Sequence, residues 1–198
     1  MANNDDFQKA YEIFKIAYRR EAFLLSPEVI HLKYKVHKNP FTGGIEIPEE
    51  KRICIANILS DGKLALVLGW GDYQLAKAEG KPIRTIVLNY GTNNPKRGKF
   101  VDRKVITQKI QQCFLENKEA SFVVTRTKGK LVQLSDIIVP FKEQPSNCKV
   151  KRAKAVYKSL GDVDIPAVID SKMILRDGYA RYCALKELGV QRIRTIMI

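Results

Sequence analysis

The sequence predicts an α+β protein made of two similar units in tandem, each with a mixed sheet and flanking helices. The first observation is a repeat: pairing Gly69 with Gly178 gives an offset of 109 residues. At this offset several further residues meet an identical partner, among them Asp61, Lys63, Tyr73, Lys77 and Gly80. The second observation is a shared order of strand, turn, strand, glycine, helix, glycine and strand. Glycine fits both ends of a helix because it permits close backbone approach and left-handed dihedrals. We therefore expect residues 54–80 to superpose on 163–189.

The first unit is expected over residues 23–90, after a helix within residues 1–22. In that helix the aromatic residues Phe7, Tyr11, Phe14 and Tyr18 recur at spacings of three and four, which is typical of an amphipathic helix. Alternating apolar residues predict a strand from Val29 to Val36. The remaining predicted elements are strands at 53–58 and 64–68, a helix ending at Gly80, and a strand at 83–88.

The second unit is expected over residues 121–198, and residues 91–120 are expected to form a basic loop and a connecting helix. The connecting helix, between Val101 and Asn117, has enough apolar positions to pack against a unit. The predicted elements of the second unit are a strand beginning near 131, a basic helix at 149–161, strands at 165–169 and 173–175, a helix ending at Gly189, and a strand at 193–198.

Composition excludes several classes of protein. The chain has 198 residues, of which 45% are hydrophobic, so it can bury a substantial core. No apolar run approaches the roughly 20 residues of a membrane helix. The first residues carry Asp5 and Asp6 where a signal peptide carries basic and apolar residues, so we expect a cytoplasmic protein. The four cysteines lack CxxC spacing, and we expect neither a metal site nor a disulfide framework.

The positive charge is concentrated in the second half of the chain. The formal net charge is +14, of which residues 1–90 contribute +2 and residues 91–198 contribute +12. Such asymmetry favours a polyanionic partner such as DNA, because cationic side chains release counterions when they neutralise phosphates. The alternative is a solubilising surface. The candidate contacts are Lys96, Arg97, Lys99, Lys149, Lys151, Arg152 and Lys154.

Arg181 is the most informative residue of the second unit. It falls in the first turn of a predicted helix, on the side of Ala184 and Leu185, whereas Tyr179 and Tyr182 fall outside that side. The helix N-terminus carries partial positive charge and burial disfavours an unpaired cation, so Arg181 needs an anion. One candidate is an internal carboxylate, Asp177 or Asp170. The other is a phosphate held by the free amides of Gly178, Tyr179, Ala180 and Arg181.

The run LRDGYARYCALKELGVQRIRTIMI, preceded by LVQLSDIIVPF and IPAVID, resembles the ParB N-terminal domain, also called the ParB-like nuclease domain, which shares a fold with sulfiredoxin. The resemblance covers residues 131–198 and extends more faintly to residues 24–90. It implies that Gly178 and Arg181 bind a nucleotide phosphate, with Asp177 matching the acid of the motif. We expect Asp170 and Tyr182 to support the same site. A nucleoside triphosphate, with or without Mg²⁺, is the implied cofactor.

The chain also departs from the family pattern. Sulfiredoxin-like proteins place a catalytic cysteine where this chain has Tyr179, so we do not expect sulfinic-acid reductase activity. ParB clamp proteins carry an arginine pair where only Arg181 stands here. They also carry DNA-binding and dimerisation domains beyond this unit, so we do not expect a complete partition protein. In the first unit Leu68 and Asp72 replace Asp177 and Arg181. Because an acid repels phosphate, we expect that unit to be a degenerate, structural copy.

Three function classes follow. The leading hypothesis is a ParB-like protein that binds a nucleotide or nucleic-acid phosphate and is DNA-associated or regulatory. The first alternative is an enzyme, either a metal-dependent nuclease or a nucleotide phosphohydrolase. Its candidate acids are Asp162, Asp164, Asp170 and Asp177, although their spacing does not place them all on one side of a strand. The second alternative is a protein-interaction module.

Overall fold

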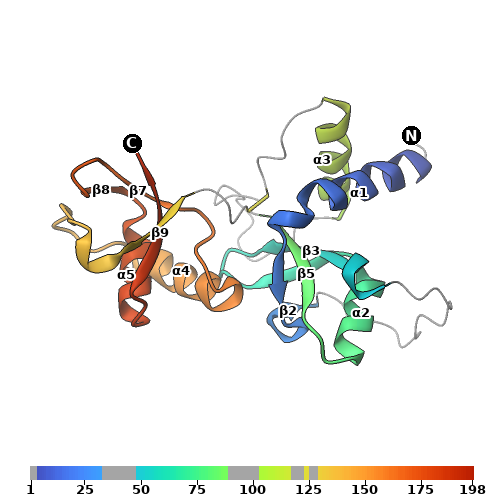
Figure 1. Ribbon diagram of the computed structural model, residues 1–198, viewed down its shortest axis with the longest axis horizontal. Helices are drawn as coiled ribbons and strands as arrows, with labels where there is room; N and C mark the ends of the chain where they lie inside the picture. Colours follow the sequence, from blue (N-terminus) through green and yellow to red (C-terminus); the bar gives the residue numbers. More distant parts are fainter. Residues whose placement is uncertain (1–3, 33–47, 89–102, 117–122, 125–128) are drawn as a thin grey trace. The chain divides into compact units, whose positions relative to one another are not determined.

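The computed structural model describes residues 4–32, 48–88, 103–116, 123–124 and 129–198 (Figure 1). The chain divides into two compact units, residues 1–59 with 64–124 and residues 60–63 with 125–198. Each unit contains helices and one mixed sheet, so the molecule is of the α+β class.

The sheet of the first unit has the strand order β1-β5-β3-β4-β2. Strand β3 runs parallel to β5 and antiparallel to β4, so the sheet is mixed. The elements are α1 (Asn4–Tyr18), η1 (Arg19–Glu21), β1 (Phe23–Leu25), η2 (Pro27–Val29), β2 (Ile30–His31), η3 (Glu49–Lys51), β3 (Ile53–Ile58), β4 (Leu64–Leu68), α2 (Trp70–Ala78), β5 (Ile83–Leu88) and α3 (Arg103–Leu115).

Helices cover both faces of this first sheet. On one face Ile55 of β3 belongs to a core cluster with Phe14 of α1 and Ile106 of α3. On the other face Cys54 lies against Gly69, where α2 begins. Successive strand residues point to opposite faces, which explains why every residue of β3 is buried. Figure 1 shows α1 and α3 on one side of β3 and β5, and α2 on the other.

The sheet of the second unit has the strand order β6-β9-β7-β8. Strand β7 runs parallel to β9 and antiparallel to β8. The elements are β6 (Lys130–Gln133), η4 (Leu134–Asp136), α4 (Asn147–Leu160), β7 (Ala167–Ile169), β8 (Leu175–Asp177), α5 (Tyr179–Glu187) and β9 (Arg192–Met197).

One face of the second sheet carries most of the core of this unit. Ala167, Leu185 and Ile193 belong to one buried cluster, and α4 packs against α5. On the opposite face Leu131 and Ile196 are 54% and 39% exposed. In the first unit the corresponding face is covered by α1 and α3. In the second unit this face is therefore more exposed.

The two sheets share their strand order and their register. Strands β1, β5, β3 and β4 correspond to β6, β9, β7 and β8. Leu24 faces Arg84 as Leu131 faces Arg194, and Ile55 faces Ile86 as Val168 faces Ile196.

Register also corrects the expected alignment of the two halves. Ile55 pairs with Leu68 as Val168 pairs with Asp177, so the β3–β4 segment is four residues longer than the β7–β8 segment. The offset of 109 therefore holds for β4 and α2 but becomes 113 for β3. A single offset across residues 54–80 was wrong because the hairpin differs in length between the units.

Two strand predictions also differ from the structure. The sequence did not predict β1, a three-residue strand paired with β5 at one edge of the sheet. Within the described part of the expected strand at 29–36, only Ile30 and His31 form a strand, and residues 33–36 lie outside the described residues. Short strands of this kind depend on a neighbouring strand for their hydrogen bonds, which leaves little local signal.

Candidate functional site

Gly178 forms the tight junction between β8 and α5. Its φ is 93°, and a Cβ at this position would lie 2.9 Å from Cα of Ala167 in β7. The same geometry occurs in the first unit, where φ of Gly69 is 84° and a Cβ would lie 2.7 Å from Cα of Cys54. Both junctions require glycine for packing alone. The glycine by itself is therefore no sign of a ligand.

Arg181 pairs with Asp164, and this partner differs from the internal candidates Asp177 and Asp170. Nε of Arg181 lies 3.3 Å from Oδ1 of Asp164. Asp164 is only 5% exposed, and its Oδ2 lies 3.1 Å from Nη1 of Arg152. One buried carboxylate thus lies between two guanidinium groups, which leaves the cluster net positive.

The Arg181 guanidinium also lies against the start of α5. Its Nη1 is 3.3 Å from the point where a Cβ on Gly178 would be. The first hydrogen bond of the helix runs from the Tyr182 amide to the Gly178 carbonyl at 3.0 Å. The amides of Tyr179, Ala180 and Arg181 precede that bond and have no acceptor within the helix. A cation therefore lies next to the glycine from which the helix starts, and helix N-terminal amides are groups that bind anions.

Asp170 and Asp177 have different environments. Asp170 closes the β7–β8 turn: Oδ1 accepts the amides of Lys172 and Ile174, both at 2.9 Å. Oδ2 accepts Nε of Arg176 at 2.9 Å. The Ile174 amide is the largest cause of the lowered pKa of Asp170, and Arg176 lowers it further. Asp177 is exposed at the end of β8. Asp170 therefore supports the turn and makes no pair with Arg181.

The two tyrosines of α5 pack against the unit, although the helical pattern placed them outside its buried side. Tyr179 stacks on Phe141, with ring centroids 4.8 Å apart. The Tyr182 hydroxyl donates to the Leu134 carbonyl at 3.5 Å. Both tyrosines contact the apolar cluster of the second unit. Sequence reasoning missed Phe141, which is 41% exposed and adjoins the residue after Gly178.

Asp72 of the first unit occupies the position of Arg181 but makes a different contact. It is 9% exposed, and its Oδ2 accepts the Ile53 amide at 3.0 Å. Burial raises the pKa of Asp72, and the bond from Ile53 partly opposes that rise. At the offset of 113 the counterpart of Ile53 is Pro166, which has no amide hydrogen. The second unit thus has Arg181 in place of Asp72, and it also has Pro166 in place of the Ile53 amide that Asp72 binds.

The basic residues expected to contact nucleic acid fall into three groups. Lys96, Arg97 and Lys99 lie outside the described residues. Arg152 pairs with Asp164, and Lys154 pairs with Glu187. Lys149 and Lys151 are exposed on α4. Helical periodicity located the lysines on α4, but only tertiary contacts identify which cations have carboxylate partners.

The candidate acids of the enzyme alternative are dispersed among arginines. Asp162 accepts Nε of Arg194 at 2.9 Å, and Asp164 and Asp170 are paired as described above. Within the described part of the chain, no three His, Cys, Asp or Glu side chains form a group that could hold a metal ion.

The four cysteines are free thiols. Burial raises the pKa of Cys54 to about 12, despite a contact with the Thr85 hydroxyl. Burial also raises the pKa of Cys183. Thiolates are the reactive form, so these two side chains are poor nucleophiles at neutral pH.

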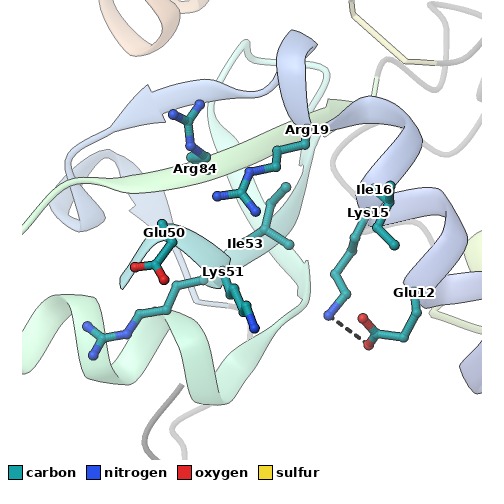
Figure 2. A pocket seen from close by; sticks show the side chains of 9 residues that line it. Glu12, Lys15, Ile16, Arg19, Glu50, Lys51, Ile53 and Arg84 are labelled. Atoms are coloured by element: carbon teal, nitrogen blue, oxygen red, sulfur yellow. Dashed lines mark ion pairs between the residues drawn. The ribbon is translucent and has the colours of Figure 1, made fainter. Parts of the chain in front are cut away.

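Each unit contains a hollow that the sequence did not predict. The first-unit hollow has a volume of about 250 Å³ and is shown in Figure 2. It is lined by Glu12, Lys15, Ile16, Arg19, Glu50, Lys51, Arg52, Ile53 and Arg84. The second-unit hollow has a volume of about 350 Å³, and its lining includes Arg192, Arg194 and Asp162. Gly178 to Arg181 line neither of these two hollows.

Comparison of the chain with protein-family models, curated proteins and solved structures finds no match. Of the helices that the structure describes, none is both long and apolar enough to cross a lipid bilayer.

Proposed function

We propose that the chain consists of two tandem ParB/sulfiredoxin-like units and that the second unit binds the phosphate of a nucleotide or nucleic acid at the start of α5. The observation that carries the proposal is the position of Arg181, whose guanidinium lies against Gly178, the residue that precedes the first-turn amides. Arginine and helix N-terminal amides are both preferred phosphate ligands.

Electrostatics supports this site over a purely internal ion pair. Asp164 is shared between Arg152 and Arg181, so its single negative charge does not neutralise both cations. The Nε contact of Arg181, at 3.3 Å, is long for a charge-assisted hydrogen bond. A phosphate beside Gly178 supplies the missing negative charge and accepts hydrogen bonds from the amides.

The neighbouring aromatic pair favours a nucleotide over inorganic phosphate. Phe141 stacks on Tyr179 and remains 41% exposed. An exposed ring beside a phosphate site offers a surface for a base, and such stacking contributes about 1 to 3 kcal/mol per base.

The test compares two arginines that share Asp164. Arg181→Ala and Arg152→Ala each remove one partner of the same carboxylate, so both should lower the unfolding free energy, by about 1 to 3 kcal/mol. Only Arg181→Ala should abolish nucleotide binding, because only Arg181 lies against Gly178. Calorimetric titration with the common nucleoside triphosphates, with and without Mg²⁺, measures binding, and denaturant unfolding measures stability.

Normal binding by the Arg181→Ala protein would refute the proposed site. Equal loss in both variants would assign the effect to local structure around Asp164. Release of inorganic phosphate during the titration would show that the protein hydrolyses the nucleotide, as the phosphohydrolase alternative expects.

A further inference from the structure

We propose that the first unit has its own anion site, the hollow between α1, η1, η3 and β5, and that it binds a small phosphate monoester. This site is separate from Gly178 to Arg181 and is built from different elements. It reverses the expectation that the first unit is only structural.

The lining of this hollow is strongly cationic. It contains five Lys and Arg side chains and two carboxylates, a formal charge of +3. Two of the cations are compensated: Lys15 pairs with Glu12 at 2.7 Å and Arg52 with Glu79 at 2.8 Å. Figure 2 shows the Lys15–Glu12 pair as a dashed line.

The other three cations, Arg19, Lys51 and Arg84, have no carboxylate partner among the described residues. They come from η1, η3 and β5, so folding brings them to the lining of one hollow, with the Arg84 guanidinium turned away from Ile53 in Figure 2. Figure 2 shows Arg19 and Lys51 extending from different elements on either side of Ile53. Glu50 also lines the hollow, and its single negative charge offsets at most one of these three cations. Gathering the remaining like charges disfavours folding, and a bound anion removes that cost.

In the second unit, the arginine that corresponds to Arg84 has a carboxylate partner within the protein. By strand register Arg84 corresponds to Arg194, because each faces a leucine on the neighbouring antiparallel strand. Arg194 binds Asp162 at 2.9 Å and also donates to the Gly129 carbonyl at 3.2 Å. Arg84 has neither contact.

The residues before β3 also differ in charge from their counterparts before β7. At the offset of 113, Asp162 and Asp164 correspond to Glu49 and Lys51. Glu49 forms an ion pair with Lys81 at 2.6 Å. Lys51 is positively charged, whereas its counterpart Asp164 is negatively charged. Neither of these two positions therefore supplies a carboxylate to Arg84, and an external anion takes that place.

Size and lining indicate the kind of anion. A volume of about 250 Å³ lies just below the usual range of ligand pockets, roughly 300 to 1,000 Å³, and suits a small molecule. Ile16 and Ile53 add apolar surface beside the cations. A phosphate group with a short organic substituent matches both features, because arginines bind phosphate through paired N–H groups.

The test measures phosphate binding in the full-length Arg181→Gln protein, so that the second-unit site does not contribute. Inorganic phosphate and glycerol 3-phosphate are titrated calorimetrically at constant ionic strength. In this background Arg84→Gln and Arg19→Gln should each weaken binding by about tenfold or more, as expected for loss of a charged hydrogen bond. Arg194→Gln is the matched control, and it should leave phosphate affinity unchanged.

Thermal melts provide an independent readout. Arg84→Gln should leave the melting temperature unchanged or raise it, since it removes an uncompensated charge, whereas Arg194→Gln should lower it. Absence of phosphate binding in the Arg181→Gln background, or equal weakening by Arg84→Gln and Arg194→Gln, would overturn the inference. If the unmodified protein binds phosphate and the Arg181→Gln protein does not, the proposed second-unit site stands and the first-unit site fails.

Discussion

At the scale of single residues, the two strand-to-helix junctions share a packing role and differ in charge. Gly178 and Gly69 are both required by close backbone approach, yet only the second junction is followed by an arginine in the first helical turn. The proposed phosphate site at this junction therefore depends on Arg181, whose position in the first unit is held by Asp72. A motif glycine has to be judged together with the side chain three residues later.

Substitution of Gly178 should separate backbone strain from steric overlap. Gly178→Ala should lower the unfolding free energy by about 2 to 4 kcal/mol, because it combines an unfavourable φ with contacts under 3 Å to Ala167. Gly189→Ala is the matched control, since its φ is 70° but no atom lies within 4 Å of the added Cβ. It should cost only about 1 kcal/mol. Equal losses in denaturant unfolding would show that the Ala167 contact contributes nothing.

At the scale of elements, corresponding helices join their sheets through opposite charges. In the first unit α2 presents a carboxylate to the amide at the start of β3. In the second unit Pro166 removes that donor, and α5 presents an arginine to Asp164, two residues earlier. Both helices are therefore anchored near the start of the corresponding central strand, by different partners.

Asp72 tests this anchoring. Asp72→Leu should lower the unfolding free energy by about 1 to 3 kcal/mol, because it leaves the buried Ile53 amide without an acceptor. Asp72→Asn keeps an oxygen at that place and should cost much less.

The raised pKa of Asp72 adds a pH dependence to the unfolding free energy. The unfolded carboxyl loses its proton first as pH rises, so this residue lowers stability between its unfolded and folded pKa values. The Asn protein should lack that decline in a series of unfolding curves, and a decline that persists would assign it to another group.

At the scale of the whole molecule, residues 91–198 hold 22 Lys and Arg against 10 Asp and Glu, so a net charge of +12 remains whichever ion pairs form within that segment. Arg152, Lys154 and Arg194 have carboxylate partners, while Lys149 and Lys151 are exposed. The exposed lysines therefore remain the described candidates for contact with nucleic-acid phosphates.

We expect weak DNA binding that depends on salt and not on sequence. In gel-shift measurements, the Lys149→Gln/Lys151→Gln protein should lower the slope of log affinity against log salt by about 2, close to one unit for each lost phosphate contact. The exposed pair Lys9 and Arg20, changed to Gln in the other half of the chain, is the control and should leave the slope unchanged. Absence of binding at low salt would make the charge a solubility feature.

The sequence by itself determined most of the regular elements. Strands β3, β4 and β5 and the ends of α2 and α5 follow from apolar runs and bounding glycines, which are local signals. Repetition of the same signals indicated two similar units before any contact was known. Strand β1 and the change of offset at β3 were missed, because both depend on pairing with a distant strand.

The charge partners were decided only by the tertiary structure. Sequence reasoning gave Arg181 the nearby acids Asp170 and Asp177, whereas the fold pairs it with Asp164. It gave no sign that Arg19, Lys51 and Arg84 line one hollow. Ion pairs form between side chains that are close in space, and a sheet with parallel crossovers brings together residues that are distant in sequence. Periodicity reports which side of an element is buried, but it carries no information about what that side meets.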